Sequence, residues 1–355
     1  MTPKKTIGIL TAGGDCPGLN AAIRGIGKTA ILQYGMTVHG FVGGYQGLMN
    51  RESVELTERN LSGLLTLGGT ILGTSREKPF KKAAGSVDDK PDKIKKTFEA
   101  LGLDCLVCIG GNGTQKTAWK LAKEGLPVVG IPKTIDNDVW GTDRTFGFDT
   151  AVDIAVDALD RLHTTASSHR RIMVAEVMGH QAGWLALHSG VAGGGDAILL
   201  PEIPTDLNKL AAFLEGRAKA GKTYSIVVVA EGARFPGDQG EEGAPASGRL
   251  PESAGRFLAR TLEAMTGIET RETILGYIQR GGSPSPTDRI LATRYGTAAA
   301  DLIATGQYGR MVTLKGSDIS SLPLSEVAGK LKLVTPLDPL ILAARKFRTF
   351  IGDTD

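Results

Sequence analysis

Short runs of apolar residues alternate along this chain with longer segments in which apolar positions recur every three or four residues. The short runs predict buried strands and the longer segments predict amphipathic helices. The predicted strands are Lys5–Thr11, Thr37–Val42, Asp104–Ile109, Leu126–Ile131, Ile172–Val177, Tyr224–Ala230, Arg271–Leu275 and Met311–Leu314. The predicted helices are Ala21–Tyr34, Lys90–Leu101, Gln115–Glu124, Asp149–His163, Gln181–Val191, Leu207–Lys219, Glu252–Thr266, Thr287–Thr305 and Pro339–Arg348. The polar stretch Phe235–Gly248 is expected to be a surface loop.

Strands and helices follow one another in turn, which predicts an α/β fold with mostly parallel sheets and right-handed crossovers. The chain has 355 residues, more than a single hydrophobic core usually supports, so two domains are expected. In such sheets ligands bind beyond the carboxyl ends of the strands.

Glycine-rich turns follow several of the predicted strands. Ala12–Asn20 and Gly110–Thr114 each lie between a strand and a helix, and Leu67–Arg76 is glycine-rich and ends in an arginine. Glycines let backbone N–H groups approach an anion, and the start of a helix favours negative charge. The spacing does not match the dinucleotide fingerprint GxGxxG, so we predict phosphate or nucleotide sites without assigning that fingerprint, and a plain tight turn is the alternative.

The stretch Pro132–Asp138, PKTIDND, places two carboxylates two residues apart, directly after a buried strand. If the segment stays extended, Asp136 and Asp138 project to the same side. Two like charges in one place are costly unless a metal ion or a proton relieves them. The alternative is an acidic turn with Asx-type geometry and no chemistry.

Two other patterns suggest sites that the context does not support. The segment Gly216–Thr223 fits the Walker A pattern, but it follows a predicted helix and precedes a strand, the reverse of a phosphate loop. His180 and His188 have a spacing that a metal pair can use, although a plain helix face is the favoured interpretation. Arg271, Tyr277 and Arg280 are expected to converge on one anion.

Composition restricts the classes of partner. The net charge of +3 gives no argument for nucleic acid, and no stretch approaches a membrane span. The three cysteines lack disulfide spacing, and Cys105 and Cys108 lie in an apolar run, so we expect a cytoplasmic protein without a zinc or redox CxxC. One basic segment is interpreted as a solvated face that also attracts phosphorylated substrates; it contains Lys78, Lys81, Lys82, Lys90, Lys93, Lys95 and Lys96.

Seven motifs in this order resemble the phosphofructokinase family: GGDCPGLNAAIRG, GGTILGTSR, GGNGT, PKTIDND, TFGFDTA, EVMGHQAGWLA and GYIQRGGSPSPTDRILATR. The resemblance implies two doubly wound α/β domains, with residues 1–147 and 279–329 for the phosphoryl donor and 148–278 and 330–355 for the sugar phosphate. It implies Mg²⁺-dependent phosphoryl transfer to the 1-hydroxyl of fructose 6-phosphate. It also implies a homo-oligomer, a dimer or tetramer, with shared active sites.

The same resemblance assigns roles to individual residues. Asp136 matches the catalytic base, and Asp138 the aspartate that supports magnesium and the base. Thr134, Lys133 and Arg76 are expected near the transferred phosphoryl group. The expected donor site consists of Gly14, Arg76, Gly111, Asn112, Gly113 and Thr114. The expected substrate site consists of Thr134, Asp136, Asp138, Arg171, Met178, Gly179, His180, Glu231, Arg271, Tyr277 and Arg280, with Arg171 and Arg271 supplied by a neighbouring subunit.

Some positions depart from the family pattern. Asn112 stands where ATP-dependent bacterial members carry an aspartate linked to magnesium, so Asn112 and Asp138 are the expected metal ligands with one weaker partner. Tyr277 replaces a common histidine and His180 a common arginine. Arg24 matches an arginine of the effector site that the resemblance implies, but Lys28 replaces another arginine of that site.

Two positions indicate which phosphoryl donor is used, and they favour different donors. Gly113 is the glycine that leaves room for a nucleotide, whereas pyrophosphate-dependent members place an aspartate there. Lys133 is typical of the pyrophosphate-dependent members. Steric room for the nucleotide affects the choice of donor more than an added cation does. We therefore expect ATP as the donor, with a pyrophosphate-dependent enzyme as the alternative. A non-catalytic sugar-phosphate-binding regulatory subunit is the other alternative, although Asp136, Asp138, Thr134 and Arg76 are all present.

Overall fold

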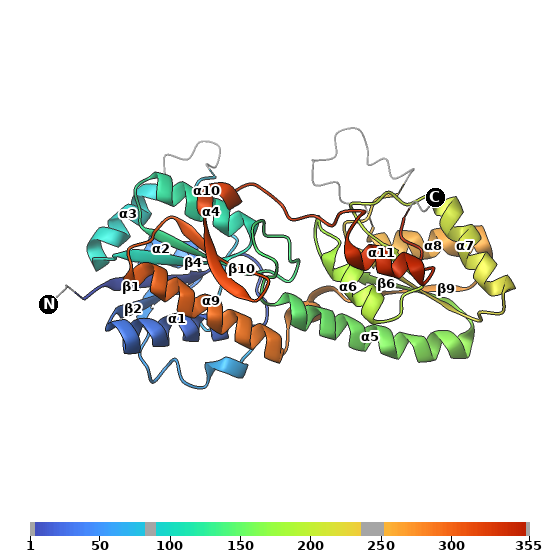
Figure 1. Ribbon diagram of the computed structural model, residues 1–355, viewed down its shortest axis with the longest axis horizontal. Helices are drawn as coiled ribbons and strands as arrows, with labels where there is room; N and C mark the ends of the chain where they lie inside the picture. The colour runs from blue at the N-terminus through green and yellow to red at the C-terminus, as the bar shows by residue number, and fades with distance from the viewer. Residues whose placement is uncertain (1–3, 82–89, 236–251, 353–355) are drawn as a thin grey trace. The chain divides into compact units, whose positions relative to one another are not determined.

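The computed structural model describes residues 4–81, 90–235 and 252–352, which form two compact units (Figure 1). Unit 1 comprises Met1–Thr150 and Arg280–Lys332, and unit 2 comprises Ala151–Gln279 and Leu333–Asp355. The expected surface loop lies outside the described residues from position 236 onward, and so does Lys82. The assignment of a donor role to one unit and a sugar-phosphate role to the other stays a prediction.

Unit 1 is built on a seven-stranded sheet in the order β11-β10-β5-β4-β1-β2-β3. The five inner strands are parallel, and β3 and β11 pair antiparallel with β2 and β10 at the two edges. The strands are β1 (Thr6–Thr11), β2 (Thr37–Phe41), β3 (Ser53–Glu55), β4 (Cys105–Gly110), β5 (Val128–Pro132), β10 (Arg310–Lys315) and β11 (Asp318–Pro323).

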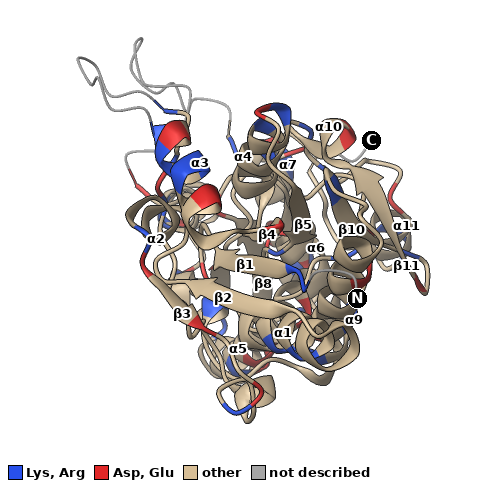
Figure 2. Cartoon of the chain, turned by 90° about the vertical axis from the view of Figure 1, so that its left-hand side faces the viewer, with Lys and Arg blue, Asp and Glu red and all other residues tan. Residues whose placement is uncertain are grey.

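Helices cover both faces of this sheet, as the near-continuous apolar strands require (Figure 2). One face carries α1 (Leu19–Tyr34) and α9 (Pro286–Ala304). These two helices approach closely at Gly25 and Gly296, where an added Cβ would lie 2.9 Å from Thr293 O and 2.7 Å from Ala22 O. The other face carries α2 (Tyr45–Asn50), α3 (Lys90–Leu101), α4 (Asn112–Lys123) and α10 (Leu324–Val327).

The core of unit 1 on the second face joins strand and helix residues. Leu10, Leu106 and Val128 of the sheet pack with Phe98 of α3 and Leu121 of α4, and all five are buried. Burying a side chain of this size contributes about 1.5–3 kcal/mol, so the helices are held mainly by this contact. The described lysines of the basic segment are exposed or half-buried, and Figure 2 shows several basic positions on α3. Ion pairs join Lys90 to Glu77 and Lys95 to Glu124.

Unit 2 is built on a four-stranded parallel sheet in the order β7-β8-β6-β9. The strands are β6 (Ile172–Val177), β7 (Ala197–Leu199), β8 (Ser225–Ala230) and β9 (Thr270–Ile274). The helices are α6 (Trp184–Ala192), α7 (Leu207–Lys219), α8 (Ala254–Thr266) and α11 (Pro339–Lys346), together with α5 (Phe148–His169), which starts at the end of the first segment of unit 1.

The α/β class with mostly parallel sheets is confirmed. Five α-helices and strands of the described residues escaped the sequence patterns because they are short or at an edge: α2, β3, β7, β11 and α10. Helix α7 precedes β8 and Gly221 adopts a left-handed conformation after it (φ 86°), which confirms that the Walker A pattern is not a phosphate loop here. Within the described residues no helix is long and apolar enough to span a membrane.

Candidate active site

The loops that follow β1, β4 and β5 meet at the carboxyl edge of the sheet in unit 1, because these three strands are parallel neighbours. The glycine loop after β1 is joined to the loop that precedes Arg76. Gly13 N donates to Ser75 O at 3.0 Å, and Thr74 Oγ1 donates to Gly13 O at 2.7 Å. Arg76 itself is exposed at the end of this second loop. The two glycine-rich segments singled out in the sequence therefore lie side by side.

Lys133 links all three strand ends. Its backbone N–H donates to Gly110 O at 3.1 Å, and its Nζ lies 3.3 Å from Ala12 O and also donates to Gly14 O. The side chain is only 2% exposed, and this burial lowers the pKa of the ammonium group. Thr114 Oγ1 donates to the same Ala12 carbonyl at 3.4 Å. Lys133 thus places a buried positive charge beneath the first glycine loop.

The acidic segment after β5 forms a turn and does not stay extended. Thr134 Oγ1 donates to Asp136 Oδ2 at 3.0 Å and accepts from Asp136 N at 3.1 Å. Asn137, between the two aspartates, has φ 52° in the left-handed region. The expectation that strand alternation aligns the two carboxylates is therefore wrong, because the chain turns at this point. They are nevertheless close enough for the charge of Asp136 to raise the pKa of Asp138.

Asp138 is buried at 6% exposure, and its pKa is raised to about 7, chiefly by burial and then by Asp136. Asn112 Nδ2 donates to the main-chain oxygen of Asp138 at 3.4 Å. The other side-chain atom of Asn112, Oδ1, is buried and has no hydrogen-bond partner among the described residues. An unpaired acceptor next to a buried carboxylate is the arrangement that a hard cation completes.

The turn Gly111–Thr114 forms the start of α4, which begins three residues earlier than the sequence pattern predicts. Its backbone N–H groups are therefore those of a helix N-terminus, where an anion is favoured. Gly113 is exposed, and a Cβ built on it meets nothing within 4 Å. The position is open, as expected for a nucleotide-type donor site.

Arg280 lies against the first glycine loop within unit 1. Its Nη1 donates to Asp15 O at 3.0 Å, and an added Cβ on Gly14 would lie 2.7 Å from that nitrogen. The resemblance assigns Arg280 to the sugar phosphate, and the structure places its guanidinium next to the donor loop. A larger residue than glycine at position 14 would push this guanidinium away.

In unit 2 four of the expected sugar-phosphate residues fall at the carboxyl ends of β6 and β8, which are paired strands: Met178, Gly179, His180 and Glu231. Glu231 Oε1 accepts from His180 N at 2.9 Å, and Gly179 has φ 142°, a conformation that favours glycine. Gln279, which the sequence analysis missed, is fully buried, and its Oε1 accepts from Met178 N at 3.3 Å. No pattern marks such a residue, because its role depends on a contact 101 positions away.

His180 and His188 do not lie on one helix. His180 precedes α6 in a left-handed conformation (φ 52°), so the two residues do not share a helix face. Within residues 4–81, 90–235 and 252–352 no group of three or more His, Cys, Asp and Glu side chains is placed to hold a metal ion. The interpretation of the pair as one plain helix face is wrong, because His180 lies before the helix.

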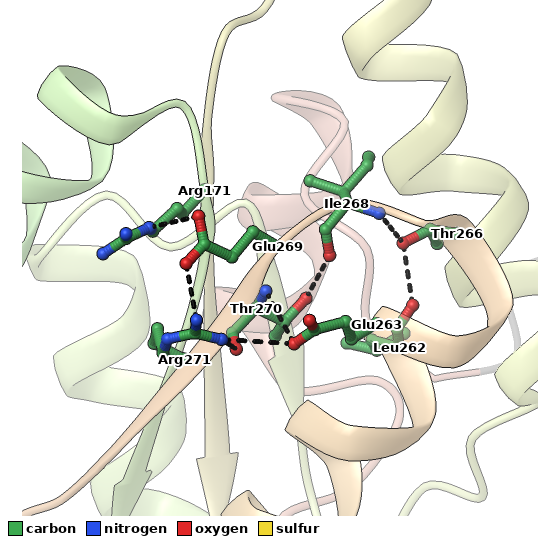
Figure 3. A network of polar contacts seen from close by, with 8 residues as sticks. All are labelled: Arg171, Leu262, Glu263, Thr266, Ile268, Glu269, Thr270 and Arg271. Carbon is green, nitrogen blue, oxygen red and sulfur yellow. Dashed lines mark hydrogen bonds and ion pairs between the residues drawn. The ribbon is translucent and has the colours of Figure 1, made fainter.

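Arg171 and Arg271, drawn in Figure 3, lie at the amino-terminal ends of β6 and β9. This end of the unit 2 sheet is opposite to the carboxyl ends of its strands. Arg171 precedes β6, and the guanidinium of Arg271 is turned toward the amino end of β9 by a bond to Thr270 O at 2.8 Å. One carboxylate joins both arginines, since Glu269 lies 2.8 Å from Arg171 Nε and 2.5 Å from Arg271 Nη2. Tyr277 follows the carboxyl end of β9, so the predicted convergence of Arg271 with Tyr277 is wrong.

Comparisons with known protein sequences find a matching family and similar relatives. The sequence profile of the family described as "Phosphofructokinase" matches residues 6–303. The chain is 58% identical over 347 residues to "ATP-dependent 6-phosphofructokinase 3" of Bacteroides thetaiotaomicron, covering 98% of this chain and 99% of that protein. It is 47% identical over 337 residues to "Pyrophosphate--fructose 6-phosphate 1-phosphotransferase" of Streptomyces coelicolor, covering 93% and 96%.

A solved structure supports the fold. The crystal structure of a pyrophosphate-dependent phosphofructokinase from Nitrosospira multiformis superimposes with a TM-score of 0.82 at 22% identity, covering 99% of this chain and 93% of that one. The resemblance drawn from the seven motifs is thereby confirmed across nearly the whole chain. From the match over residues 6–303 and the extent of the identity to its relatives, the chain belongs to the phosphofructokinase family.

Proposed function

We propose that the protein is an ATP-dependent 6-phosphofructokinase of glycolysis. It transfers the γ-phosphoryl group of ATP to the 1-hydroxyl of fructose 6-phosphate, giving fructose 1,6-bisphosphate and ADP. The observation that carries the proposal is the buried acidic turn Thr134–Asp138 beside two glycine loops in unit 1. The names of the relatives at high identity support the same reaction.

Asp136 is proposed as the general base. It accepts the proton of the sugar 1-hydroxyl as that oxygen attacks the γ-phosphorus, while the bond between the γ-phosphorus and the bridging oxygen of ADP breaks. The hydrogen bonds between Thr134 and Asp136 hold the carboxylate in one orientation. Asp136 is half-buried, so it is accessible to a substrate and still protected from bulk water.

The donor phosphates are proposed to bind along Gly14 and the turn Gly111–Thr114. The start of α4 offers backbone N–H groups to an anion. Lys133 and Arg76 supply the positive charge that a transferring phosphoryl group requires. Lys133 is already desolvated in the free protein, which strengthens its interaction with a phosphate that reaches it.

Magnesium fits the donor set at this site. Asp138 and Asn112 are the residues that would hold it together with donor phosphates, since Mg²⁺ is commonly bound through one or two carboxylates plus substrate phosphates. The buried, unpaired Oδ1 of Asn112 and the raised pKa of Asp138 both favour a cation there. When bound, the ion neutralises charge on the donor phosphates.

ATP is the proposed donor because Gly113 opens onto free space and the relatives of higher identity are named ATP-dependent. Pyrophosphate is the second candidate. Lys133 favours it, and the Streptomyces coelicolor relative carries a pyrophosphate-dependent name. The steric gate at Gly113 outweighs the added cation, since Lys133 serves the terminal phosphate of either donor.

Met178, Gly179, His180, Glu231, Tyr277 and Arg280 are proposed to hold the sugar phosphate. Arg171 and Arg271 are proposed to reach the site of a neighbouring copy in a dimer or tetramer. Their place at the opposite edge of the unit 2 sheet supports this, because a strand of six residues is roughly 20 Å long. A cytoplasmic location completes the proposal, in line with three unpaired, buried cysteines.

The test is a donor assay with the purified full-length protein, fructose 6-phosphate and Mg²⁺, using ATP or pyrophosphate in separate reactions. Formation of fructose 1,6-bisphosphate with ATP is expected. Turnover with pyrophosphate alone would contradict the choice of donor. Binding of fructose 6-phosphate without turnover on either donor would instead favour a regulatory subunit.

A further inference from the structure

Lys332 contacts the loop that carries the proposed base, although it lies in none of the seven motifs and is the last residue of unit 1. Its Nζ lies 3.0 Å from Asn137 Oδ1, 3.1 Å from Thr142 O and 2.8 Å from Asp143 O. An ammonium group has three N–H donors, and all three of these oxygens lie within hydrogen-bond distance of it. The side chain of Lys332 therefore binds the acidic turn at Asn137 and the residues after that turn at Thr142 and Asp143.

The backbone around Lys332 adds two more contacts with the same loop. Lys332 N donates to Asp138 O at 2.8 Å, and Leu331 forms an antiparallel bridge with Val139. The segment 331–332 thus runs along the residues that follow the proposed base. The charge of Lys332 also acts on Asp138, whose pKa it lowers, and burial lowers the pKa of Lys332 itself to about 8.

Asn137 is the point at which this contact matters most. It lies between Asp136 and Asp138 and has φ 52°, so its conformation sets the direction of both carboxylates. A left-handed non-glycine residue persists only where its surroundings fix it. Its Oδ1 accepts from Lys332 Nζ and from Thr145 N at 3.0 Å, and Asn137 is 4% exposed.

We propose that Lys332 is a positioning residue for phosphoryl transfer, which fixes Asn137 and the loop 137–143 so that the carboxylates of Asp136 and Asp138 keep one arrangement. The inference rests on the proposed function for its catalytic consequence. It does not require Lys332 to touch substrate. The loop geometry that it predicts can be measured whether or not the reaction is the proposed one.

The experiment compares Lys332→Met and Lys332→Arg with Lys315→Met in the full chain. Lys315 is the matched control, because its Nζ binds the same loop at Asp143 Oδ1 (3.1 Å) but its side chain is 57% exposed. Steady-state kinetics with ATP and fructose 6-phosphate are combined with hydrogen exchange of the amides at 137–145. Lys332→Met is expected to lower kcat at least about tenfold with both KM values within about threefold, since small misplacement of a catalytic group is costly.

Faster exchange at 137–145 is expected in Lys332→Met and not in Lys315→Met, and Lys332→Arg is expected to recover part of kcat. Unchanged exchange in Lys332→Met would overturn the inference, and so would an equal kinetic loss in Lys315→Met. If the wild type does not phosphorylate fructose 6-phosphate, the proposed function fails while the exchange result still decides whether Lys332 orders the loop.

Discussion

The side-chain amide of Asn112 donates to the main-chain oxygen of Asp138 at 3.4 Å, and its own oxygen stays unpaired in the described structure. An amide at this position keeps the buried acidic turn intact without adding a second negative charge. Asp138 already has a pKa raised to about 7. We therefore expect that asparagine at position 112 favours folding stability in the absence of metal over strong binding of the proposed metal ion.

Asn112→Asp is expected to reverse this balance. A carboxylate cannot donate to Asp138 O and repels its carboxylate, which costs about 1–2 kcal/mol of folding free energy without metal. With Mg²⁺ the added oxygen ligand strengthens binding of the ion. Thermal unfolding in EDTA and in Mg²⁺ measures both effects: a lower Tm in EDTA and a larger Mg²⁺-induced rise than in the wild type. Asn112→Ala, without the added charge, should not show the larger rise.

Asp136→Ala is expected to lower kcat by about 10²–10⁴-fold, the range for loss of a general base. Calorimetric titration with fructose 6-phosphate should give a Kd close to that of the wild type. Asp143→Asn is the control, because Asp143 lies in the same loop, is half-exposed and pairs with Lys315. Comparable turnover in Asp136→Ala would refute its role as base.

Gly113→Asp tests the donor gate. The position lies in the first turn of α4, where an acidic residue suits the helix dipole, and a Cβ there meets open space, so the fold should be kept. The carboxylate is expected to lower kcat/KM for ATP by about 100-fold or more through repulsion of the nucleotide phosphates. Gly113→Ala should change it little. An unchanged kcat/KM for ATP in Gly113→Asp would show that this position does not select the donor.

Glu269→Gln tests the pair Arg171 and Arg271, which one carboxylate joins (Figure 3). Loss of the charge releases both guanidinium groups, and we expect the KM for fructose 6-phosphate to rise several-fold while the KM for ATP stays the same. Glu263→Gln is the matched control, since Glu263 lies 3.3 Å from Arg271 and otherwise accepts only a main-chain bond, from Thr270 N at 3.3 Å, among the described contacts of its carboxylate. Equal effects of both variants would contradict the role of the shared carboxylate.

Ionisation of Asp288 is expected to make the free energy of unfolding depend on pH, in a direction that follows from its raised pKa. Its Oδ2 accepts from Thr150 N at 2.8 Å and from Thr150 Oγ1 at 2.6 Å, and burial raises its pKa to about 6. The folded state therefore binds a proton more tightly than the unfolded chain, and the free energy of unfolding falls as pH rises from about 4 to 6, by up to about 3 kcal/mol.

Asp288→Asn is expected to flatten this part of the stability profile, because the amide oxygen can keep the bonds from Thr150 without ionising. Urea unfolding in EDTA between pH 4 and 7 measures the slope for both proteins. Asp138 contributes in the same window and is unchanged in both, so the difference between them isolates Asp288. Parallel profiles would show that Asp288 does not titrate in this range.

The sequence alone determined much of the architecture. The predicted strand Ile172–Val177 and the predicted helix Leu207–Lys219 match β6 and α7 to the residue. Such elements can be predicted because the spacing of apolar residues along the chain indicates which of them are buried in a strand or on one face of a helix. The motifs also led to the family and to the residues of the acidic turn. Short edge elements such as β11 were missed, since pairing with a neighbour and not their own pattern forms them.

Only the tertiary structure decided the arrangement of the site. The chain turns at Asn137, where strand alternation predicted an extended segment. The guanidinium of Arg271 lies toward the amino end of β9, whereas Tyr277 follows its carboxyl end. The tertiary structure also brought Lys332 to a loop 195 positions earlier in the chain. Contacts of this kind depend on where distant segments pack, and the sequence around Lys332 carries no local signal of the acceptors that its side chain will meet.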